Sequence, residues 1–485
     1  MRIGSRLSSP NLCQRARVAM ALCALLATCL SAQTFTTLYS FCSQAGCPDG
    51  QFPYASLVQG IDGNLWGTTQ QGGAHGSGTI YKITPDGQLT TLYNFCSQRK
   101  CWDGSYPYSG LTLANNGSLY GTTQIGGVGA GTVFLITASG GFTSLHKFQV
   151  ADGYSPTGGL VQANNGSLYG TTQQGGGYNE GEFFNITPGG ALTPLYSFCS
   201  QSGCPEYPDA TLVQDANGDF WGTTYYGGAY GAGAVFQVTA RGAPTTVYSF
   251  CAQAGCVDGE YPAGGVIEAA AGDFYGTTQA GGAYGFGTVF KLTAQGNLTT
   301  LYSFCPTMSG CLDGSSPRAG LIQATDGNFY GSTTGGGIIE HGTIFRITAS
   351  GALTTLYMFC AQSGCTDGSY PYAGLVQATD GRFYGTTTGY GTTGGPPTIY
   401  RLSVGLAPFI KTQPTSGKAE SAVTILGTAL AGATSVTFNG VAAEFTVVSD
   451  DEITTAVPMG AATGRVRVVT PKGTLSSNTV FRVRP

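Results

Sequence analysis

Residues 57–95 read LVQGIDGNLWGTTQQGGAHGSGTIYKITPDGQLTTLYNF, and the motifs of this stretch recur along most of the chain. The phenylalanine that closes the stretch, at position 95, has counterparts at positions 41, 148, 198, 250, 304 and 359, and successive members of this set of seven are 50 to 55 residues apart. Each copy contains four short β-type runs separated by turn residues, which is typical of a propeller blade. The sequence therefore predicts an all-β fold in which seven copies form a seven-bladed β-propeller.

The connections define where one blade ends and the next begins. The Asp-Gly pairs at 62–63 and 86–87 predict tight hairpins between neighbouring strands. About ten residues or more separate the LYNF run from the next LVQ-type run, a length that suits the step between blades. We therefore expect a blade to begin with the LVQ strand on the inside and to end with the LTTLYNF strand on the outside.

This register leaves two incomplete pieces of sheet. The strand at 35–41 precedes the first complete blade, and the last blade, at 375–404, has only three strands. We expect the N-terminal strand to complete the last blade, which closes the ring and removes an exposed sheet edge.

Cysteine pairs mark most of the long links between blades. Twelve of the fifteen cysteines form six close pairs, and an even count in an exported chain predicts disulfides. Zinc is the alternative, but each pair stands in a different repeat and the chain has only three histidines. The third repeat loses both cysteines together, where its link shortens to FQVADG at 148–153, as a covalently closed loop predicts. The predicted disulfides join Cys42 with Cys47, Cys96 with Cys101, Cys199 with Cys204, Cys251 with Cys256, Cys305 with Cys311 and Cys360 with Cys365.

The first thirty residues predict an export signal rather than part of the fold. Four arginines precede an apolar run at 18–30, and Ser31-Ala32 offers small residues for cleavage. The run is short for a membrane span. We expect a cleaved signal peptide at 1–32, with lipoprotein processing at Cys29 as the alternative, and therefore a secreted or cell-surface protein.

The composition limits the partners. Charged residues make up 9% of the chain against ~25% in ordinary domains, while 41% of residues are hydrophobic and the net charge is −4. Nucleic acid is not expected as a partner. No second hydrophobic segment follows the leader, so no transmembrane segment is expected in the mature chain.

The repeat also resembles a known family. Its pattern D-G-x-x-Y-G-T-T, G-G and G-T-x-F-x-I-T is similar to the GloVer tandem repeat of exported bacterial proteins, the "choice-of-anchor" group, over residues 35–404. The resemblance implies a surface or secreted location and carries no established activity. Relatives often end in a sorting signal, which we do not see here, so the mode of surface retention stays open. The strand order is also similar, more weakly, to propellers of the streptogramin-lyase type.

The last eighty residues differ in character from the repeats. They contain no cysteine, and the segments TQP at 412–414, VTILG at 423–427, SVTFNG at 435–440 and VVTP at 468–471 resemble an IPT/TIG immunoglobulin-like domain. Asn439-Gly440 predicts a type I′ hairpin. Such domains serve as spacers, adhesion modules or protein contacts. The expected organisation is a propeller at 33–405 followed by an immunoglobulin-like β-sandwich at 406–485.

Two sets of residues recur in nearly every repeat and predict structural roles. The aromatic residue before Gly-Thr-Thr is expected to pack between blades. The aspartate that precedes glycine in the long link is expected to form a turn, with a ring of calcium sites as the alternative, so no cofactor is expected. The aromatic set is Trp66, Tyr120, Tyr169, Trp221, Tyr275, Tyr330 and Tyr384; the aspartates are Asp49, Asp103, Asp152, Asp258, Asp313 and Asp367.

Residues that differ between repeats predict a ligand-binding face. In a four-stranded meander the cysteine link and the Gly-Gly loop leave the blade at the same end, and polar and aromatic residues gather there. Aromatic rings with few charges suit stacking on sugars, so we expect a polysaccharide or other envelope polymer as the ligand, with a surface protein as the alternative partner. Packing of these rings between adjacent loops is the structural alternative. The candidates are Tyr54, Trp102, Tyr108, Tyr154, Tyr178, Tyr226, Tyr230, Tyr284, Phe286, Arg318, Tyr372 and Tyr390.

The sequence offers little support for catalysis. No nucleophile elbow, HExxH motif or glycine-rich phosphate loop is present. His75 and His341 lie in corresponding loops at different offsets, and His146 replaces the tyrosine of other repeats. We therefore expect a binding or scaffolding protein, with a carbohydrate-active hydrolase or lyase and a purely structural envelope protein as alternatives. A carboxylate pair for such a hydrolase would come from Glu180, Glu260, Glu268 or Glu340.

Overall fold

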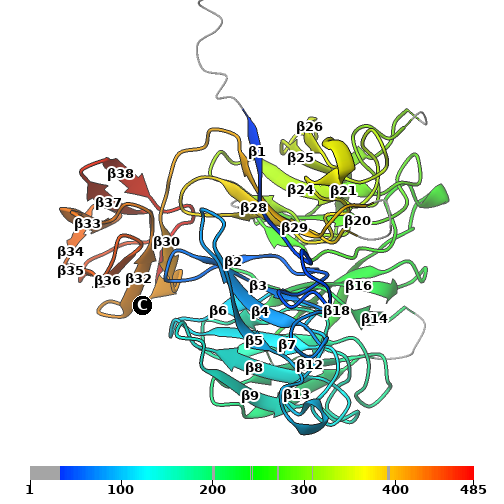
Figure 1. Ribbon diagram of the computed structural model, residues 1–485, viewed down its shortest axis with the longest axis horizontal. Coiled ribbons are helices and arrows are strands. Elements are labelled where there is room, and N and C mark those ends of the chain that lie inside the picture. The colour runs from blue at the N-terminus through cyan, green and yellow to red at the C-terminus, as the bar shows by residue number, and fades with distance from the viewer. Residues whose placement is uncertain are drawn as a thin grey trace, which may run out of the picture.

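The computed structural model describes residues 33–198, 203–240, 242, 244–269, 272–307, 310–389 and 394–484 (Figure 1). The described chain is almost entirely β-strand and turn, so the all-β prediction is confirmed. Its helices are three single 3-10 turns, η1 (Arg99–Cys101), η2 (Ala254–Cys256) and η3 (Ser363–Cys365), and none of the described helices could cross a membrane.

Seven antiparallel sheets follow one another along the repeats, and each is a meander with the predicted strand order. We number them by the repeat that supplies the inner strand. Sheet 1 contains β2 (Val58–Gln59), β3 (Leu65–Thr69), β4 (Thr79–Ile83) and β5 (Leu89–Asn94). Sheet 2 contains β6 (Thr112–Leu113), β7 (Leu119–Thr123), β8 (Thr132–Ile136) and β9 (Phe142–Lys147). Sheet 3 contains β10 (Val161–Gln162), β11 (Leu168–Thr172), β12 (Glu182–Ile186) and β13 (Leu192–Ser197).

The next three sheets repeat this arrangement, and one of them gains a strand. Sheet 4 contains β15 (Val213–Gln214), β16 (Phe220–Gly227), β17 (Ala234–Val238) and β18 (Thr245–Ser249), with β14 (Pro205–Pro208) paired to the far end of β16. Sheet 5 contains β19 (Ile267–Glu268), β20 (Phe274–Thr278), β21 (Thr288–Leu292) and β22 (Leu298–Ser303). Sheet 6 contains β23 (Ile322–Gln323), β24 (Phe329–Thr333), β25 (Thr343–Ile347) and β26 (Leu353–Met358).

The seventh sheet combines the two ends of the repeat region. β27 (Val376–Gln377), β28 (Phe383–Thr387) and β29 (Thr398–Ser403) come from the last repeat, and β1 (Thr34–Ser40) pairs antiparallel with β29. The N-terminal strand therefore completes the last repeat, as the sequence register predicts.

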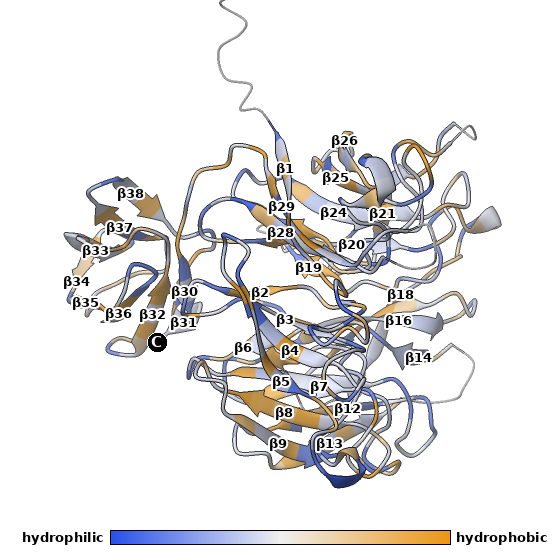
Figure 2. Ribbon diagram, in the orientation of Figure 1, coloured by the Kyte–Doolittle hydropathy of each residue, from blue (hydrophilic) through white to orange (hydrophobic). Residues whose placement is uncertain are grey.

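The hydrophobic core lies between the sheets rather than within one of them. Each of seven buried clusters draws side chains from two successive sheets, so the sheets are joined by packing and not by a continuous hydrogen-bonded ladder. The cluster that contains Leu65, Tyr81 and Tyr384 joins sheet 7 to sheet 1. Figure 2 shows the hydrophobic residues gathered on the strands and the hydrophilic ones on many of the connecting loops.

The aromatic residues before Gly-Thr-Thr pack between sheets, as predicted. All seven are at most 5% exposed, and six of them form a hydrogen bond with a polar residue of the hairpin four to six positions earlier. The Trp66 indole N–H donates to Asp62 at 3.1 Å, and the Tyr330 hydroxyl donates to Asp326 at 2.9 Å. The hairpin residue therefore serves both the turn and the buried ring.

The aspartates of the long links accept hydrogen bonds that close the cysteine loops. At the link between sheets 4 and 5, the Tyr248 hydroxyl of β18 donates to Asp258 Oδ2 at 2.8 Å, and the backbone N–H of Ala252 donates to the same oxygen at 2.9 Å. At the link between sheets 2 and 3, His146 of β9 takes the place of the tyrosine, and its Nε2 lies 3.0 Å from Asp152 Oδ2. These carboxylates therefore organise the links, which is the role that the turn interpretation predicts.

Five of the predicted disulfides are present. They join Cys42 with Cys47, Cys96 with Cys101, Cys251 with Cys256, Cys305 with Cys311 and Cys360 with Cys365. Cys204 is also disulfide-bonded, while Cys199 lies outside the described residues, as does the predicted signal peptide.

The C-terminal residues form a separate small β-domain, grouped at one side in Figure 1. Two four-stranded sheets enclose its core around Ile425, Phe438 and Val468. The predicted type I′ hairpin is present, because Asn439 and Gly440 both have positive φ and link Phe438 to Val441. The strands are β30 (Lys411–Gln413), β31 (Ser416–Gly417), β32 (Ala422–Leu426), β33 (Ser435–Phe438), β34 (Val441–Ala443), β35 (Phe445–Val447), β36 (Glu452–Ala456), β37 (Val466–Thr470), β38 (Gly473–Ser476) and β39 (Arg482–Val483).

This domain lies against the hairpin ends of the inner strands. Gln413 Nε2 donates to the carbonyl of Leu113 in sheet 2 at 3.0 Å, and Ser416 Oγ donates to Asn164 Oδ1 in the third repeat at 2.8 Å. The Lys411 ammonium donates to the carbonyl of Gln377 in sheet 7 at 2.7 Å, and burial lowers the pKa of this lysine to about 8. The C-terminal domain therefore covers one end of the inner strands. The other end, where the long links enter, is the end that a ligand can reach from solvent.

Candidate functional site

A cavity of about 460 Å³ lies among the inner strands at the end where the long links enter. Each long link contains a proline near its end, which we call the link proline, and the segment that follows it in all seven repeats contributes to the cavity wall. The link prolines are Pro53, Pro107, Pro156, Pro208, Pro262, Pro317 and Pro371. This volume is within the usual range of small-molecule sites. The cavity is therefore the place where residues from every repeat converge.

One position per repeat supplies most of the chemical variety of this wall. The motif Pro-x-x-Gly-Leu recurs with small changes, in which small residues fill the third and fourth positions, whereas the residue after proline varies most from repeat to repeat. In repeat order these residues are Tyr54, Tyr108, Thr157, Asp209, Ala263, Arg318 and Tyr372, and all of them line the cavity. We call this set the variable ring.

A backbone kink directs each of these residues. The residue before the link proline is never glycine, yet in all seven repeats its φ lies between 52° and 58°. Tyr106 is an example, since its N–H donates to Ser77 of the preceding repeat and its carbonyl accepts from Gln124 of its own. A non-glycine residue in this conformation costs about 1–2 kcal/mol. The same strained geometry in every repeat fixes the direction in which the variable ring points.

Hydroxyl groups on the second strands of the sheets form hydrogen bonds with the wall segment that follows the link proline. The Thr122 hydroxyl donates to the carbonyl of Pro156 at 3.1 Å, and the Thr277 hydroxyl donates to that of Ala319 at 2.9 Å. Thr386 of sheet 7 donates to the carbonyl of Pro53 at 2.9 Å, which joins the last repeat to the first. The wall of the cavity is therefore rigid and linked from one repeat to the next.

Aromatic rings and one cation form one part of the variable ring. Tyr54 stacks on Tyr108 with ring centroids 5.3 Å apart and meets Tyr372 edge-on at 5.2 Å. The guanidinium carbon of Arg318 lies 5.1 Å from the Tyr372 ring centroid. Burial, and then the charge of Asp209, raise the pKa of Tyr108 well above its ordinary value. The tyrosine hydroxyl therefore stays protonated and can donate a hydrogen bond.

Polar atoms without partners lie in the neighbouring part of the wall. Asp209 Oδ1 and Thr157 Oγ1 are buried and make no hydrogen bond with described residues. Burial raises the pKa of Asp209, and the positive charge of Arg318 partly opposes this rise. Buried polar atoms without partners are uncommon in folded proteins, and a bound water or ligand can satisfy them.

We expect Asp209→Asn to stabilise the free protein at pH 7. The folded-state pKa of Asp209 lies above its ordinary 3.8, so its contribution to stability is full below that value and is lost as the pH rises through the folded pKa. Removing the buried charge should raise the free energy of unfolding on the order of 1 kcal/mol. Thermal melts at pH 7 and pH 4 would measure this gain, which should shrink at the lower pH. Asp86→Asn, on an exposed hairpin, is the matched control, and a loss of stability in Asp209→Asn at pH 7 would contradict the assignment.

Four of the twelve binding candidates line the cavity, and seven lie elsewhere among the described residues. Tyr54, Tyr108, Arg318 and Tyr372 line it. Trp102 is exposed on a link beneath the Lys147 ammonium, and Tyr154 packs against the core between sheets 2 and 3. Tyr390 lies outside the described residues. The Gly-Gly loops and the adjoining end of β16 expose Tyr178, Tyr226, Tyr230, Tyr284 and Phe286.

The cavity also contains residues that the sequence prediction missed. Asp209 and Thr157 belong to the variable ring, and Tyr225 lines the wall where its hydroxyl donates to Gln279 at 3.0 Å. Alignment of the residue after each link proline would have found the first two. Tyr225 occupies a position where several other repeats have glutamine, which is a weaker signal.

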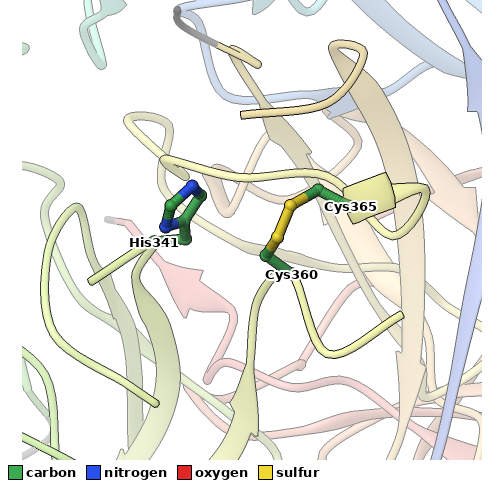
Figure 3. Close-up of side chains that lie close together, drawn as sticks. All are labelled: His341, Cys360 and Cys365. Atoms are coloured by element: carbon green, nitrogen blue, oxygen red, sulfur yellow. A yellow bond between two sulfur atoms is a disulfide. The ribbon is translucent and has the colours of Figure 1, made fainter. Parts of the chain in front are cut away.

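The groups considered for catalysis do not converge. Glu180, Glu260, Glu268 and Glu340 lie outside the cavity wall, and Asp209 is the one carboxylate among the described lining residues. His341 lies close to Cys360 and Cys365 in the one described cluster of metal-ligand side chains. Figure 3 shows that the two sulfurs are bonded to each other, so they are not available as thiolates.

Comparisons with known proteins agree with the repeat pattern. The family model described as the Gloeobacter/Verrucomicrobia repeat matches residues 25–216, 164–400 and 257–439, and the IPT/TIG domain model matches residues 409–483. No curated protein sequence matches the chain significantly.

Several solved structures have distant similarity to the chain. The extracellular domain of a Bacteroides thetaiotaomicron protein described as a hybrid two-component system is 12% identical with a TM-score of 0.49, and the alignment covers 92% of this chain but 55% of that one. An auxiliary nutrient binding protein from the same species is 14% identical with a TM-score of 0.40, and 76% of each chain is covered. TM-scores below 0.5 do not define a common fold, so these similarities add nothing to the description of the chain.

Proposed function

The chain belongs to the Gloeobacter/Verrucomicrobia repeat family and carries a C-terminal IPT/TIG domain, and from that premise we propose that it is an exported binding protein whose ligand occupies the link-end cavity. The single observation that carries this proposal is the variable ring. The motif positions around it change little among the repeats, while the residue that faces the cavity takes five different identities. A position that served only to pack would share one chemistry, as the inter-sheet aromatic residues do.

The seven sheets form the blades of a closed β-propeller in this account. Support comes from the buried cluster that joins sheet 7 to sheet 1, from the pairing of β1 with β29, and from the hydrogen bond of Thr386 to Pro53. The propeller extends over residues 33–405 and the immunoglobulin-like domain over 406–485. Disulfides in five links support an oxidising, extracellular location.

A polysaccharide or another envelope polymer is the ligand class that the cavity favours. Three tyrosines from the variable ring supply amphipathic rings that can stack on a sugar, and unpartnered oxygens lie nearby. The immunoglobulin-like domain lies against the hairpin end, so a polymer would reach the cavity from the link end. One carboxylate in the described wall favours binding over the two-carboxylate chemistry of most glycosidases.

We expect residues 33–485 to be retained on at least one polysaccharide in a panel of neutral and acidic polymers and cell-wall fractions. Tyr108→Ala should weaken retention about tenfold, which is ~1.4 kcal/mol, because it removes a ring from the cavity. Affinity electrophoresis measures the change, and analysis of released sugars tests for hydrolysis.

Tyr284→Ala is the matched control, because Tyr284 is 42% exposed on a Gly-Gly loop outside the cavity. Equal weakening by both substitutions would move the site to the outer loops. Retention on no polymer would reject the polysaccharide proposal, and release of sugars would favour an enzyme.

A further inference from the structure

The charged groups of the variable ring differ in what they can bind. The Arg318 guanidinium is half-buried, stacks on Tyr372, and forms no ion pair within 4.0 Å with a described residue. A guanidinium held by an aromatic face presents its N–H fork to a planar anion, and a carboxylate matches that fork with two parallel hydrogen bonds. This part of the cavity is therefore suited to one carboxylate.

The partner-free oxygens of the third and fourth repeats need donors instead. Asp209 Oδ1 has no donor from the described residues, and burial makes the lack of a donor costly. Thr157 Oγ1 also lacks a hydrogen-bond partner among the described residues, and this hydroxyl can both accept and donate a hydrogen bond. Hydroxyl groups on a ligand would satisfy both atoms, and a second anionic group beside Asp209 would be repelled.

We propose that the cavity recognises an acidic sugar residue, whose carboxylate pairs with Arg318 and whose ring hydroxyls bind Asp209 and Thr157. This inference rests on the proposed function and refines it from any polymer to a uronic-acid polymer. The apolar face of the sugar ring packs against the tyrosines of the variable ring, as a neutral sugar also would. The carboxylate, rather than the ring, is what distinguishes this ligand from a neutral one.

Isothermal titration calorimetry of residues 33–485 can test the carboxylate directly. The probes are hexamers of galacturonic acid and of glucuronic acid, each compared with its carboxyl-reduced counterpart, which keeps the linkages and loses only the charge. We expect at least one acidic hexamer to bind ten times more tightly than its reduced form. Arg318→Gln should abolish that preference and leave the weaker affinity for the reduced form unchanged.

Two further variants separate the roles of the charges. Arg382→Gln makes the same charge change at an exposed arginine that pairs with Asp380 at the hairpin end, and it should preserve the preference. Asp209→Asn should weaken the reduced hexamer, because a hydroxyl contact changes, and should weaken the acidic hexamer less, because the substitution also removes a negative charge from the cavity.

The outcomes distinguish this inference from the proposed function. Equal affinity for the acidic and reduced hexamers would overturn the acidic assignment and leave a neutral-sugar site in place. Failure of every saccharide to bind would overturn both proposals. Tighter binding of a free amino acid, which also offers a carboxylate and a donor, would keep the roles of Arg318 and Asp209 and overturn the assignment to a sugar.

Discussion

Removal of residues 33–41 is expected to abolish cooperative folding of the repeat region. The segment supplies β1, the outer strand of sheet 7, and Phe41, which is 1% exposed in the cluster between sheets 7 and 1. Phe35 stacks on Tyr357 with centroids 3.7 Å apart. Loss of two such phenylalanines and a strand should cost on the order of 10 kcal/mol, about the whole stability of an ordinary domain. Differential scanning calorimetry of residues 42–485 against 33–485 measures this effect.

A local change in the neighbouring link is the control for that deletion. Replacing residues 41–50 by the third repeat's FQVADG removes one disulfide and four residues but keeps β1. A loop of this size should cost about 2 kcal/mol, so a single sharp transition at lower temperature is expected. A truncated chain that melts like the parent would show that the N-terminal strand does not close the ring.

The second large effect is expected from Gly259→Ala in the link of sheet 5. Gly259 has a φ of +103°, and a Cβ there would lie 2.4 Å from Thr278 Oγ1 and 2.9 Å from Thr288 Oγ1. These hydroxyls are themselves paired at 2.8 Å behind the link. Backbone strain and overpacking together should cost ~3 kcal/mol or more. Chemical denaturation would record the loss as a lower midpoint.

Gly255→Ala provides a matched comparison within the same link. Gly255 also has a positive φ, +72°, but nothing lies within 4 Å of the Cβ that alanine would add. Alanine at this position would therefore introduce backbone strain but no steric clash, so we expect the free energy of unfolding to fall by about 1 kcal/mol. Equal losses for the two variants would mean that the threonine pair does not limit the space behind the link.

Much of the fold could be predicted because the seven repeats of one chain can be compared with one another, position by position. The difference between the short Asp-Gly hairpins and the long links predicted the order of strands in a sheet. The unpaired strand at 35–41 could then be assigned to the incomplete last repeat, where it pairs with β29. The third repeat, which lacks both cysteines of its link, supported the disulfides from the sequence alone. The kink before each link proline was not predictable, because phenylalanine, tyrosine and serine in a left-handed conformation carry no local sequence signal.

The candidate site was predicted only in part for a related reason. Aromatic residues near the links look alike in sequence, so Tyr108, which lines the cavity, was predicted together with Trp102, which is exposed on the outer surface. Their separation depends on the kink, which turns one residue of the link inward and leaves the others outside. Asp209 was missed because an aspartate beside a turn is ordinary in sequence, and its buried, unpartnered oxygen appears only in the folded chain.

Hydroxyl-radical footprinting of residues 33–485, with and without the polysaccharide that retains the protein best, tests the central claim most directly. Mass spectrometry would report the oxidation of individual tyrosines. We predict that the polymer protects Tyr54, Tyr108 and Tyr372 in the cavity and leaves Tyr230 and Tyr284 as reactive as in the free protein. Protection of Tyr230 and Tyr284 without change at the cavity tyrosines would contradict the account and place the ligand on the outer loops.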